Sequence, residues 1–290
     1  MPAEDISEVQ FALPKGRMYE SIVRLLDEAG VGLRSTARNY RPAISLSGLR
    51  VKILKPRAVV EMLGTGQRDL GFAGADWVRE DGADLVELLD TGLDRVRLVA
   101  AVPQSLRIDG DLPARTLVVA SEYERLTKRW IEERGIDARF VRSYGATEVL
   151  PPDDADCIVD NTATGSTLEA NNLEIIDEIM TSSTRLYASR SAMHDPAKRE
   201  RIEQFAMLVA SVIEARRRVM VELNVSPDRL DSVISILPCM RRPTVSPLHG
   251  ADGFAVKIAA LREELPSVIP QIKARGGTDI VVTNPIQIVS

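Results

Sequence analysis

Apolar and polar positions alternate along the first two hundred residues in blocks that match strands followed by helices. An apolar run at residues 9–13 precedes residues 18–29, whose apolar positions lie three and four residues apart before Gly30. Such spacing is typical of an amphipathic helix, whereas short apolar runs are typical of buried strands. The repeated strand-then-helix order predicts an α/β fold. Predicted strands are residues 51–54, 69–73, 86–89, 96–102, 117–120, 138–141, 157–160 and 173–176, and predicted helices include residues 58–63, 123–134 and 196–218.

The last seventy residues have a different order of elements. Strands are predicted at residues 219–224, 244–248, 254–259 and 280–289, with helices at residues 228–236 and 267–275 between them. The order βαββαβ predicts a ferredoxin-like module. Because a module of this size that follows a complete α/β body is more often regulatory or oligomeric than catalytic, we expect it to be a separate domain of that kind.

Residues 156–168 are the strongest candidate for a binding site. A strand ending in Asp160 is followed by hydroxyl side chains and a glycine, and then by a predicted helix start. The first amides of a helix lack partners and favour anions, and glycine lets the backbone approach a phosphate closely. We therefore expect Thr164, Gly165, Ser166 and Thr167 to bind phosphate, with Asp160 placed for ribose hydroxyls or a metal. The alternative is a capped turn without a ligand, because the motif is short and lacks the lysine of a P-loop.

Two earlier loops also follow predicted strands. Lys15, Gly16 and Arg17 come directly after the first strand, and Gly74 and Asp76 come after the strand at residues 69–73. Open α/β folds bind ligands at the carboxyl ends of their strands, so anion binding by the two cations and a solvated turn are both open interpretations of this loop. For Asp76, the simplest interpretation is the N-cap of a helix that starts at the next residue.

The composition narrows the function classes. The 290 residues include 37 Lys and Arg against 42 Asp and Glu, and the resulting net charge of -5 argues against nucleic acid as the main partner. No apolar run is long enough to span a membrane, and the acidic amino terminus is unlike a signal peptide. Cys157 and Cys239 lie far apart without metal-ligand spacing. We expect both cysteines to be buried, reduced thiols and the protein to be cytoplasmic.

The sequence does not indicate covalent catalysis. His194 and His249 lack a metal-ligand spacing, and no Ser-His-Asp or Cys-His arrangement can be assembled from the chain. Both histidines are interpreted as loop residues.

Taken together, these segments resemble the ATP phosphoribosyltransferase family in its long form, which has a carboxyl-terminal regulatory domain. The resemblance runs nearly from end to end, and it rests on a set of motifs in a fixed order. The matching segments are the Lys-Gly-Arg loop at residues 13–17, residues 55–57, the Asp-Leu-Gly run at residues 69–76, residues 145–148, the phosphoribosyl-pyrophosphate loop at residues 158–168, and residues 244–248.

The resemblance implies a bilobal catalytic body like the type II periplasmic binding proteins, with the active site in its cleft. Lobe one would comprise residues 1–102 and 184–218, and lobe two residues 103–183 with the phosphoribosyl-pyrophosphate loop. Residues 219–290 would form the ferredoxin-like regulatory domain.

The resemblance also implies the reaction, in which N1 of ATP displaces pyrophosphate from 5-phosphoribosyl pyrophosphate in the first step of histidine biosynthesis. Mg²⁺ would neutralise the departing pyrophosphate. Asp160, Glu148 and Arg17 are the implied catalytic residues, with Asp160 on the ribose hydroxyls and Glu148 and Asp69 near the ribose or adenine. Lys15, Arg17 and Lys55 would bind pyrophosphate or the phosphates of ATP. The remaining implied substrate contacts are Gly16, Gly74, Asp76, Thr162 and Ala163, beside the phosphate-binding residues 164–167.

The same resemblance implies feedback inhibition by histidine, for which we expect Asn224, Thr244, Ala259 and Asp279, and a homo-oligomer, either dimer or hexamer. The chain departs from the family at two places. Asn161, Thr162 and Ala163 stand where the family has apolar residues and then an acidic one, and Glu122 stands where a lysine is common. A phosphoribosyltransferase with a different nitrogen acceptor, or a cytoplasmic ligand sensor without catalysis, are the alternative functions.

Overall fold

A computed structural model describes residues 8–34, 40–107, 112–250 and 252–289 of the chain. Contacts divide the chain into two units, of which the first reaches to Ala206 and the second runs from Met207 and takes in Glu28–Gly30. The long helix α7 (Pro196–Arg217) contributes residues to both units. The limits that we predicted for the two lobes and the last domain stay a prediction.

The first unit is built on one eight-stranded sheet in the order β4-β1-β5-β10-β6-β9-β7-β8. Strand β1 runs parallel to β4 and β5, and β7 runs parallel to β8 and β9, so each end of the sheet has the parallel arrangement expected of an α/β fold. The strands are β1 (Val9–Pro14), β4 (Leu49–Leu54), β5 (Leu70–Gly74), β6 (Leu85–Pro103), β7 (Leu117–Ser121), β8 (Ala138–Arg142), β9 (Cys157–Thr162) and β10 (Leu173–Ser189), beside a ribbon of β2 (Leu33–Arg34) and β3 (Ala43–Ile44).

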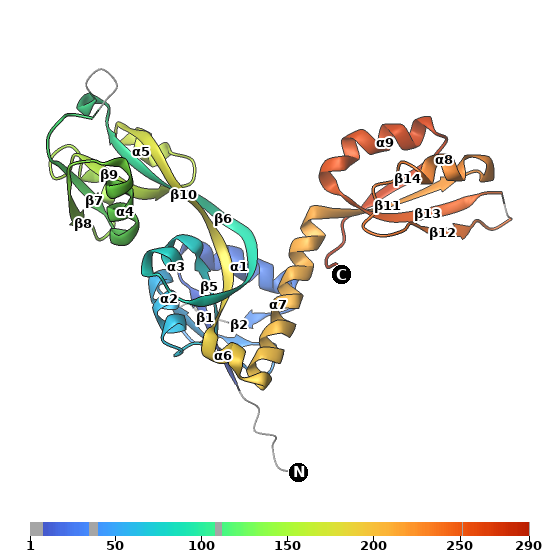
Figure 1. Ribbon diagram of the computed structural model, residues 1–290. Helices are drawn as coiled ribbons and strands as arrows, with labels where there is room; N and C mark the ends of the chain where they lie inside the picture. The colour runs from blue at the N-terminus through green and yellow to red at the C-terminus, as the bar shows by residue number, and fades with distance from the viewer. Residues whose placement is uncertain (1–7, 35–39, 108–111, 251, 290) are drawn as a thin grey trace, which may run out of the picture. The chain divides into compact units, whose positions relative to one another are not determined.

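Two long antiparallel strands join the two parallel halves of the sheet (Figure 1). Strands β6 and β10 pair with each other along most of their length, β10 also pairs with β5, and β6 also pairs with β9. The prediction of separate strands at residues 86–89 and 96–102 was therefore wrong, since both belong to β6. Gly92 and Asp94 adopt positive φ, and the pairing register shifts there, so the apolar pattern is interrupted although the strand continues. The two-halved body agrees with the predicted bilobal architecture.

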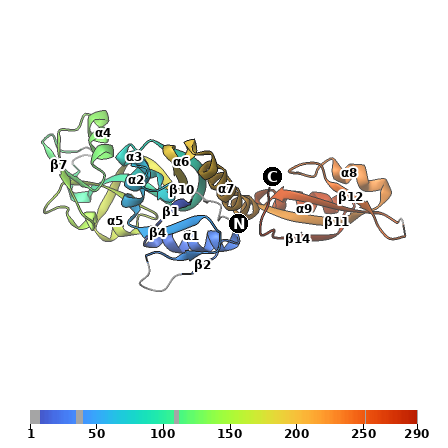
Figure 2. The same ribbon diagram turned by 90° about the horizontal axis from the view of Figure 1, so that it is seen from below.

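Helices cover both faces of the sheet, as the alternation of side chains along a strand requires. Val99, Ala101 and Ile158 pack with Leu168 of α5 (Ser166–Ala170), whereas their sequence neighbours Leu98, Ala100 and Val159 pack with Leu126 and Trp130 of α4 (Glu124–Arg134). Figures 1 and 2 show α4 and α5 on opposite sides of this half of the sheet. The other helices of the unit are α1 (Arg17–Glu28), α2 (Pro56–Gly64), α3 (Ala75–Asp81) and α6 (Arg190–His194), with single turns η1 (Gln104–Leu106) and η2 (Thr147–Val149).

Helix α7 begins as predicted. The Asp195 side chain accepts hydrogen bonds from the backbone N–H groups of Ala197 and Lys198 at 3.0 and 3.2 Å, with Pro196 in the first helical position. In the first unit its Phe205 ring lies 5.1 Å from the Phe11 ring of β1 in an edge-to-face contact. These contacts tie the start of α7 to the first unit.

The second unit contains a four-stranded antiparallel sheet in the order β12-β13-β11-β14. Alternate residues Val219, Val221, Leu223 and Val225 of β11 pack with Val268 and Ile272 of α9 (Leu265–Ala274). Helices α8 (Leu230–Ile234) and α9 lie on the same face of this sheet in Figure 1. Numbered from the first strand of the unit, the order is 4-1-3-2, which confirms the ferredoxin-like prediction. The elements are β11 (Arg218–Val225), η3 (Pro227–Arg229), α8 (Leu230–Ile234), β12 (Thr244–Pro247), β13 (Phe254–Leu261), η4 (Arg262–Glu264), α9 (Leu265–Ala274) and β14 (Thr278–Thr283).

Candidate active site

The loop between β9 and α5 is held by its own hydroxyl groups. Gly165 adopts φ +89, a conformation that favours glycine, and a Cβ built there meets nothing within 4 Å. The Gly165 N–H donates to Thr162 Oγ1 at 2.9 Å, and the hydroxyls of Thr164 and Ser166 lie 3.0 Å apart. Thr162 therefore fixes the turn from inside, whereas Thr164 and Ser166 are exposed and free to exchange their mutual contact for a ligand.

Two carboxylates face this loop across one cavity of about 350 Å³, which we call the loop cavity. Asp160 stands near the end of β9, and Glu148 stands in η2; both line the cavity together with residues 161–164 and 166–168 and Arg17. Burial, and then the negative charges of Glu148 and Glu122, raise the pKa of Asp160 to about 6, although the Asn161 N–H donates to its carboxylate at 2.7 Å. A buried carboxyl with a raised pKa beside a cavity is typical of functional sites, which makes Asp160 a candidate.

The predicted cations lie in two neighbouring cavities. Lys15 and Lys55 line a cavity of about 410 Å³, the cationic cavity, which also has Arg57 and Arg142 in its wall. Lys15 and Arg17 line a smaller cavity of about 180 Å³, together with Gly74 and Asp76. Gly16 stands between them with φ +85 at the turn from β1 into α1. The structure thus brings all three predicted cations together around one region of the first unit.

Asp76 does not cap a helix, contrary to our prediction. Helix α3 begins at Ala75 after Gly74, and no side chain caps its start. The Asp76 side chain is 5% exposed and instead accepts a hydrogen bond from Ser182 Oγ at 2.7 Å and another from the Tyr123 hydroxyl at 2.6 Å. Helix α3 starts two residues earlier than we predicted. Strand β5 ends at Gly74, and Ala75 and Asp76 already form the first turn of the helix. Asp76 therefore lies in a buried network beside the small cavity.

Asp69 is not brought together with the other predicted site residues. It lies just before β5, at the amino end of the strand, whereas Gly74 and Asp76 lie at the carboxyl end. Its carboxylate accepts hydrogen bonds from Lys198 Nζ at 2.9 and 3.0 Å and from the Gln10 N–H at 2.7 Å, and it is 3% exposed. The expectation that Asp69 lies near the ribose or adenine is therefore not met; its contacts hold α7 against the sheet.

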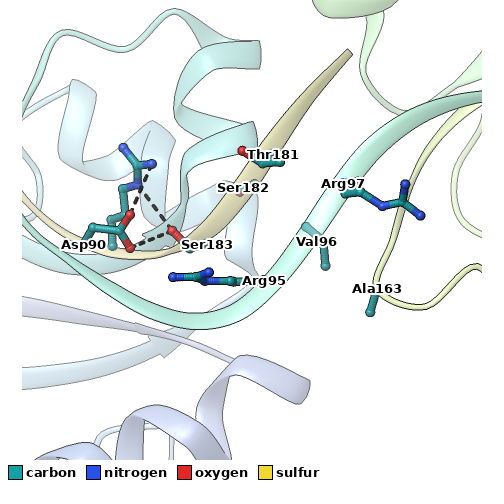
Figure 3. Close-up of a pocket in the computed structure, with 9 residues that line it drawn as sticks. Asp90, Arg95, Val96, Arg97, Ala163, Thr181, Ser182 and Ser183 are labelled. Atoms are coloured by element: carbon teal, nitrogen blue, oxygen red, sulfur yellow. Dashed lines mark hydrogen bonds and ion pairs between the residues drawn. The ribbon is translucent and has the colours of Figure 1, made fainter. Parts of the chain in front are cut away.

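A further cavity of about 400 Å³ lies against β6 and β10 (Figure 3). Its arginines are neutralised in part, because Arg185 pairs with Glu87 at 2.8 Å and Asp90 at 3.4 Å, and the Ser183 hydroxyl donates to Asp90 at 2.7 Å. The predicted residue Ala163 lines both this cavity and the loop cavity. It therefore stands between them, and we assign no ligand to the cavity against β6 and β10.

Of the four residues predicted for regulation, two lie together and the other two lie elsewhere on the sheet of the second unit. Asn224 Nδ2 donates to Asp279 Oδ2 at 3.0 Å, so these two lie together. Ala259 pairs with Met220, four residues along β11 from Asn224, which corresponds to a separation of roughly 13 Å. Thr244 pairs with Lys257 on the edge strand β12. One small ligand cannot touch all four within a single copy of this unit unless it spans that length of sheet.

Several residues that line the cavities were not predicted. Asn161 lines the loop cavity, the cationic cavity and the small cavity, and Trp77 lines the last two of these. Tyr144 lines the cationic cavity and is 87% exposed. An aromatic residue after Ser143 and an amide directly after the loop aspartate are visible in the sequence, but their placement depends on the meeting of the two halves of the sheet. Only that long-range geometry identifies them as cavity residues.

Two general features bear on the chemistry. Among the described residues, no group of three or more His, Cys, Asp or Glu side chains is arranged to hold a metal ion. Cys157 and Cys239 are free thiols; Cys157 is buried as expected, whereas Cys239 is only partly buried, contrary to our prediction. Burial raises the pKa of Cys157 to about 12, which makes it unreactive. In the part of the chain that the structure covers, no helix has the length and apolar character needed to cross a membrane.

The chain is similar to known proteins along most of its length. A family model described as ATP phosphoribosyltransferase matches residues 55–211, and one described as the HisG C-terminal domain matches residues 215–287. The ATP phosphoribosyltransferase of Pelotomaculum thermopropionicum is 36% identical over 279 residues, covering 94% of this chain and 96% of that protein. The enzyme of Desulforudis audaxviator is 35% identical, covering 94% and 96%.

A solved structure is also similar to this chain. The Thermotoga maritima ATP phosphoribosyl transferase (HisG:HisZ) complex contains a chain that aligns with a TM-score of 0.63 at 29% identity. The alignment covers 71% of this chain and 98% of that one.

Proposed function

Because the chain belongs to the ATP phosphoribosyltransferase family, the enzymes that transfer a phosphoribosyl group to ATP in histidine biosynthesis, we propose that its cavities divide the two substrates between them. In this proposal 5-phosphoribosyl pyrophosphate occupies the loop cavity and ATP occupies the cationic cavity. The observation that carries the proposal is the placement of two carboxylates, Asp160 and Glu148, opposite a glycine-hydroxyl loop in one cavity.

The loop cavity suits a phosphorylated ribose. The hydroxyls of Thr164, Ser166 and Thr167 and the first amides of α5 offer donors for the 5-phosphate, and Gly165 leaves room for it. Asp160 and Glu148 then accept hydrogen bonds from the ribose hydroxyls. Arg17, which lines this cavity and the small one, is placed for the pyrophosphate as it leaves.

The cationic cavity suits a nucleoside triphosphate. Lys15 and Lys55 supply positive charge for the phosphates, beside Arg142, whose guanidinium also pairs with Glu124. The exposed Tyr144 ring offers a flat apolar surface for the adenine. In the reaction, the N1 lone pair forms a bond to the anomeric carbon as the bond from that carbon to the pyrophosphate oxygen breaks. The bonding electrons leave with pyrophosphate, and the chain's task is to align the reactants and stabilise the charges.

Magnesium fits this arrangement as a companion of the substrate. Mg²⁺ at phosphate sites is commonly held by one or two carboxylates together with substrate phosphates, so the lack of a three-residue cluster among the described side chains is compatible with it. Asp160 and Glu148 would supply oxygen ligands. When bound, the ion would neutralise charge on the leaving pyrophosphate.

The second unit is proposed to bind histidine as a feedback inhibitor through Asn224 and Asp279, which already lie together. Thr244 and Ala259 lie elsewhere on the sheet, so they would contact the same histidine only if they came from a second copy of the chain.

Exposed apolar side chains on and after β14 support a homo-oligomer, either dimer or hexamer; they are Val281, Val282 and Ile286. Two free thiols support a reducing, cytoplasmic location.

Pyrophosphate release from ATP and 5-phosphoribosyl pyrophosphate with Mg²⁺ tests the proposal. We expect turnover by the wild type, a loss of roughly 100-fold or more in kcat/KM for Asp160→Ala, and no change for Glu133→Ala, whose carboxylate lies on the exposed side of α4 with Arg129. Full activity of Asp160→Ala would refute the assignment of the loop cavity. Pyrophosphate release with another base but not with ATP would refute the acceptor.

A further inference from the structure

Asn161 lies where the cavity proposed for 5-phosphoribosyl pyrophosphate meets the cavity proposed for ATP. Among the residues that the structure describes, it alone lines both the loop cavity and the cationic cavity, and it lines the small cavity as well. It follows Asp160 on β9 and is exposed. If one substrate sits in each cavity, the bond that joins them forms beside this side chain.

The orientation of the Asn161 amide is fixed by buried groups behind it. Tyr123 is fully buried, and its hydroxyl donates to Asp76 Oδ2 at 2.6 Å. Burial and the adjacent Asp76 charge raise the pKa of Tyr123 well above its usual range, so the phenol keeps its proton. Since that proton is used on Asp76, the phenol oxygen can only accept, and it accepts from Asn161 Nδ2 at 2.9 Å.

The network is itself well anchored. Ser182 Oγ donates to the other oxygen of Asp76 at 2.7 Å and accepts from the Asp76 N–H at 3.0 Å. The Tyr123 ring stacks on Trp77 with centroids 4.5 Å apart. Asn161 Nδ2 is therefore held toward Tyr123, and its Oδ1 is left as a neutral acceptor at the meeting point of the cavities.

This acceptor matches one feature of the adenine ring. The reacting N1 is adjacent to the carbon that carries the 6-amino group, so an N1 placed at the boundary of the two cavities puts an N–H donor there too. The cations at this boundary, Lys15 and Arg17, can only donate, and they cannot bind an amino group. A base with a carbonyl in that position would present an oxygen to Asn161 Oδ1, and the two would repel.

We propose that Asn161 is a specificity-determining residue whose Oδ1 accepts a hydrogen bond from the 6-amino group of the acceptor purine, in an orientation set by Tyr123 and Asp76. The inference rests on the proposed function. As N1 bonds to the anomeric carbon and pyrophosphate leaves with the electron pair, the purine gains a positive charge that it shares with the amino nitrogen. The hydrogen bond to Oδ1 strengthens as that charge develops, so it favours the transition state over bound ATP.

The test compares two acceptors in the full-length protein: ATP, and purine riboside 5′-triphosphate, which carries hydrogen in place of the amino group. For ATP we expect Asn161→Ala and Asn161→Leu to lower kcat/KM by roughly 10- to 100-fold, chiefly through kcat. For the analogue, whose contact is already missing, we expect a change of less than about threefold. Gln204→Ala, which removes an exposed amide of α7 that donates to Glu200, should leave both values of kcat/KM unchanged.

A second variant separates orientation from contact. Tyr123→Phe keeps Asn161 but removes the oxygen that holds its amide, so it should lower kcat/KM for ATP by roughly 3- to 10-fold and leave the analogue nearly unaffected. If the analogue is too slow to follow, its inhibition constant against ATP replaces its rate, and that constant should be the same in wild type and Asn161→Ala.

The possible outcomes distinguish a failure of this inference from a failure of the proposed function, phosphoribosyl transfer to ATP. Equal losses for ATP and the analogue in the Asn161 variants would overturn the inference while the phosphoribosyl transfer stands, as would a changed KM for 5-phosphoribosyl pyrophosphate alone. Absence of pyrophosphate release from ATP by the wild type would overturn the proposed function, and the inference with it.

Discussion

Asp160 couples the chemistry of the site to the stability of the protein. Burial and two nearby carboxylates raise its pKa from a usual value near 3.8 to about 6. The folded state therefore holds the proton more tightly than the unfolded state. The stability from this group is fully present below about pH 3.8 and is lost as the pH rises through about 6. At pH 8 the ionised carboxylate should cost on the order of 2–3 kcal/mol.

Asp160→Asn should consequently raise the free energy of unfolding at pH 8 by up to that amount and leave it nearly unchanged at pH 3.5. Urea denaturation at both pH values, in buffer with a chelator so that no divalent ion is bound, provides the measurement. A variant that is less stable than the wild type at pH 8 would show that the carboxylate is not desolvated as described.

Asp69 illustrates a residue whose role only the fold reveals. Asp69 pairs with Lys198; the Asp69 side chain is buried, at 5% exposure, and the Lys198 side chain is half-buried, at 25%. Asp69→Ala leaves the ammonium partly buried without its partner, so we expect a loss of about 3 kcal/mol in unfolding free energy. The Michaelis constants should not change, because Asp69 lies at the far end of β5 from the cavities.

The matched comparison for Asp69 is Glu203→Ala, whose pair with Arg199 is exposed on both sides and should contribute nothing measurable. A rise in KM for either substrate in Asp69→Ala, at unchanged stability, would return this residue to the active site.

At the scale of elements, the turn from β9 into α5 contains a glycine, Gly165, that we expect to serve function as well as structure, whereas Gly135 at the end of α4 serves structure alone. Gly165 and Gly135 both adopt positive φ, +89 and +62, and neither has an atom within 4 Å of an added Cβ. Alanine should cost about 1–2 kcal/mol of stability at either position because of the left-handed backbone. Only Gly165→Ala, at the start of α5, should also raise the KM for 5-phosphoribosyl pyrophosphate. Identical kinetics for the two variants would mean that the loop does not approach a phosphate.

The sequence predicted elements well where their pattern is local. The first strand, the cap of α7 by Asp195 and the order of the second unit follow from apolar spacing and capping chemistry, and the structure has them. The long strand β6 was not predicted as one element, because the positive φ of Gly92 and Asp94 interrupts the alternation on which such a prediction depends. Asn161 was missed as a site residue for a different reason. Its neighbour Tyr123 lies 38 positions away in the chain, and no local pattern relates them.

At the scale of the whole molecule, the second unit should bind the inhibitor and the first should carry the chemistry. We expect histidine to bind the full chain, to raise its melting temperature and to lower turnover. Asp279→Ala, which removes the acceptor of the Asn224 hydrogen bond, should weaken histidine binding while leaving turnover without histidine unchanged. Titration calorimetry measures the first effect and pyrophosphate release the second. Unaltered histidine affinity in this variant would move the effector site elsewhere.

The division of substrates between two cavities is tested most directly by Michaelis constants for both substrates in two variants, Ser166→Ala in the loop cavity and Tyr144→Ala in the cationic cavity. We expect Ser166→Ala to raise the KM for 5-phosphoribosyl pyrophosphate by roughly 10-fold with little change for ATP. Tyr144→Ala should raise the KM for ATP by roughly 5-fold with little change for 5-phosphoribosyl pyrophosphate. A shift of the same substrate by both variants, or the reverse assignment, would contradict the account.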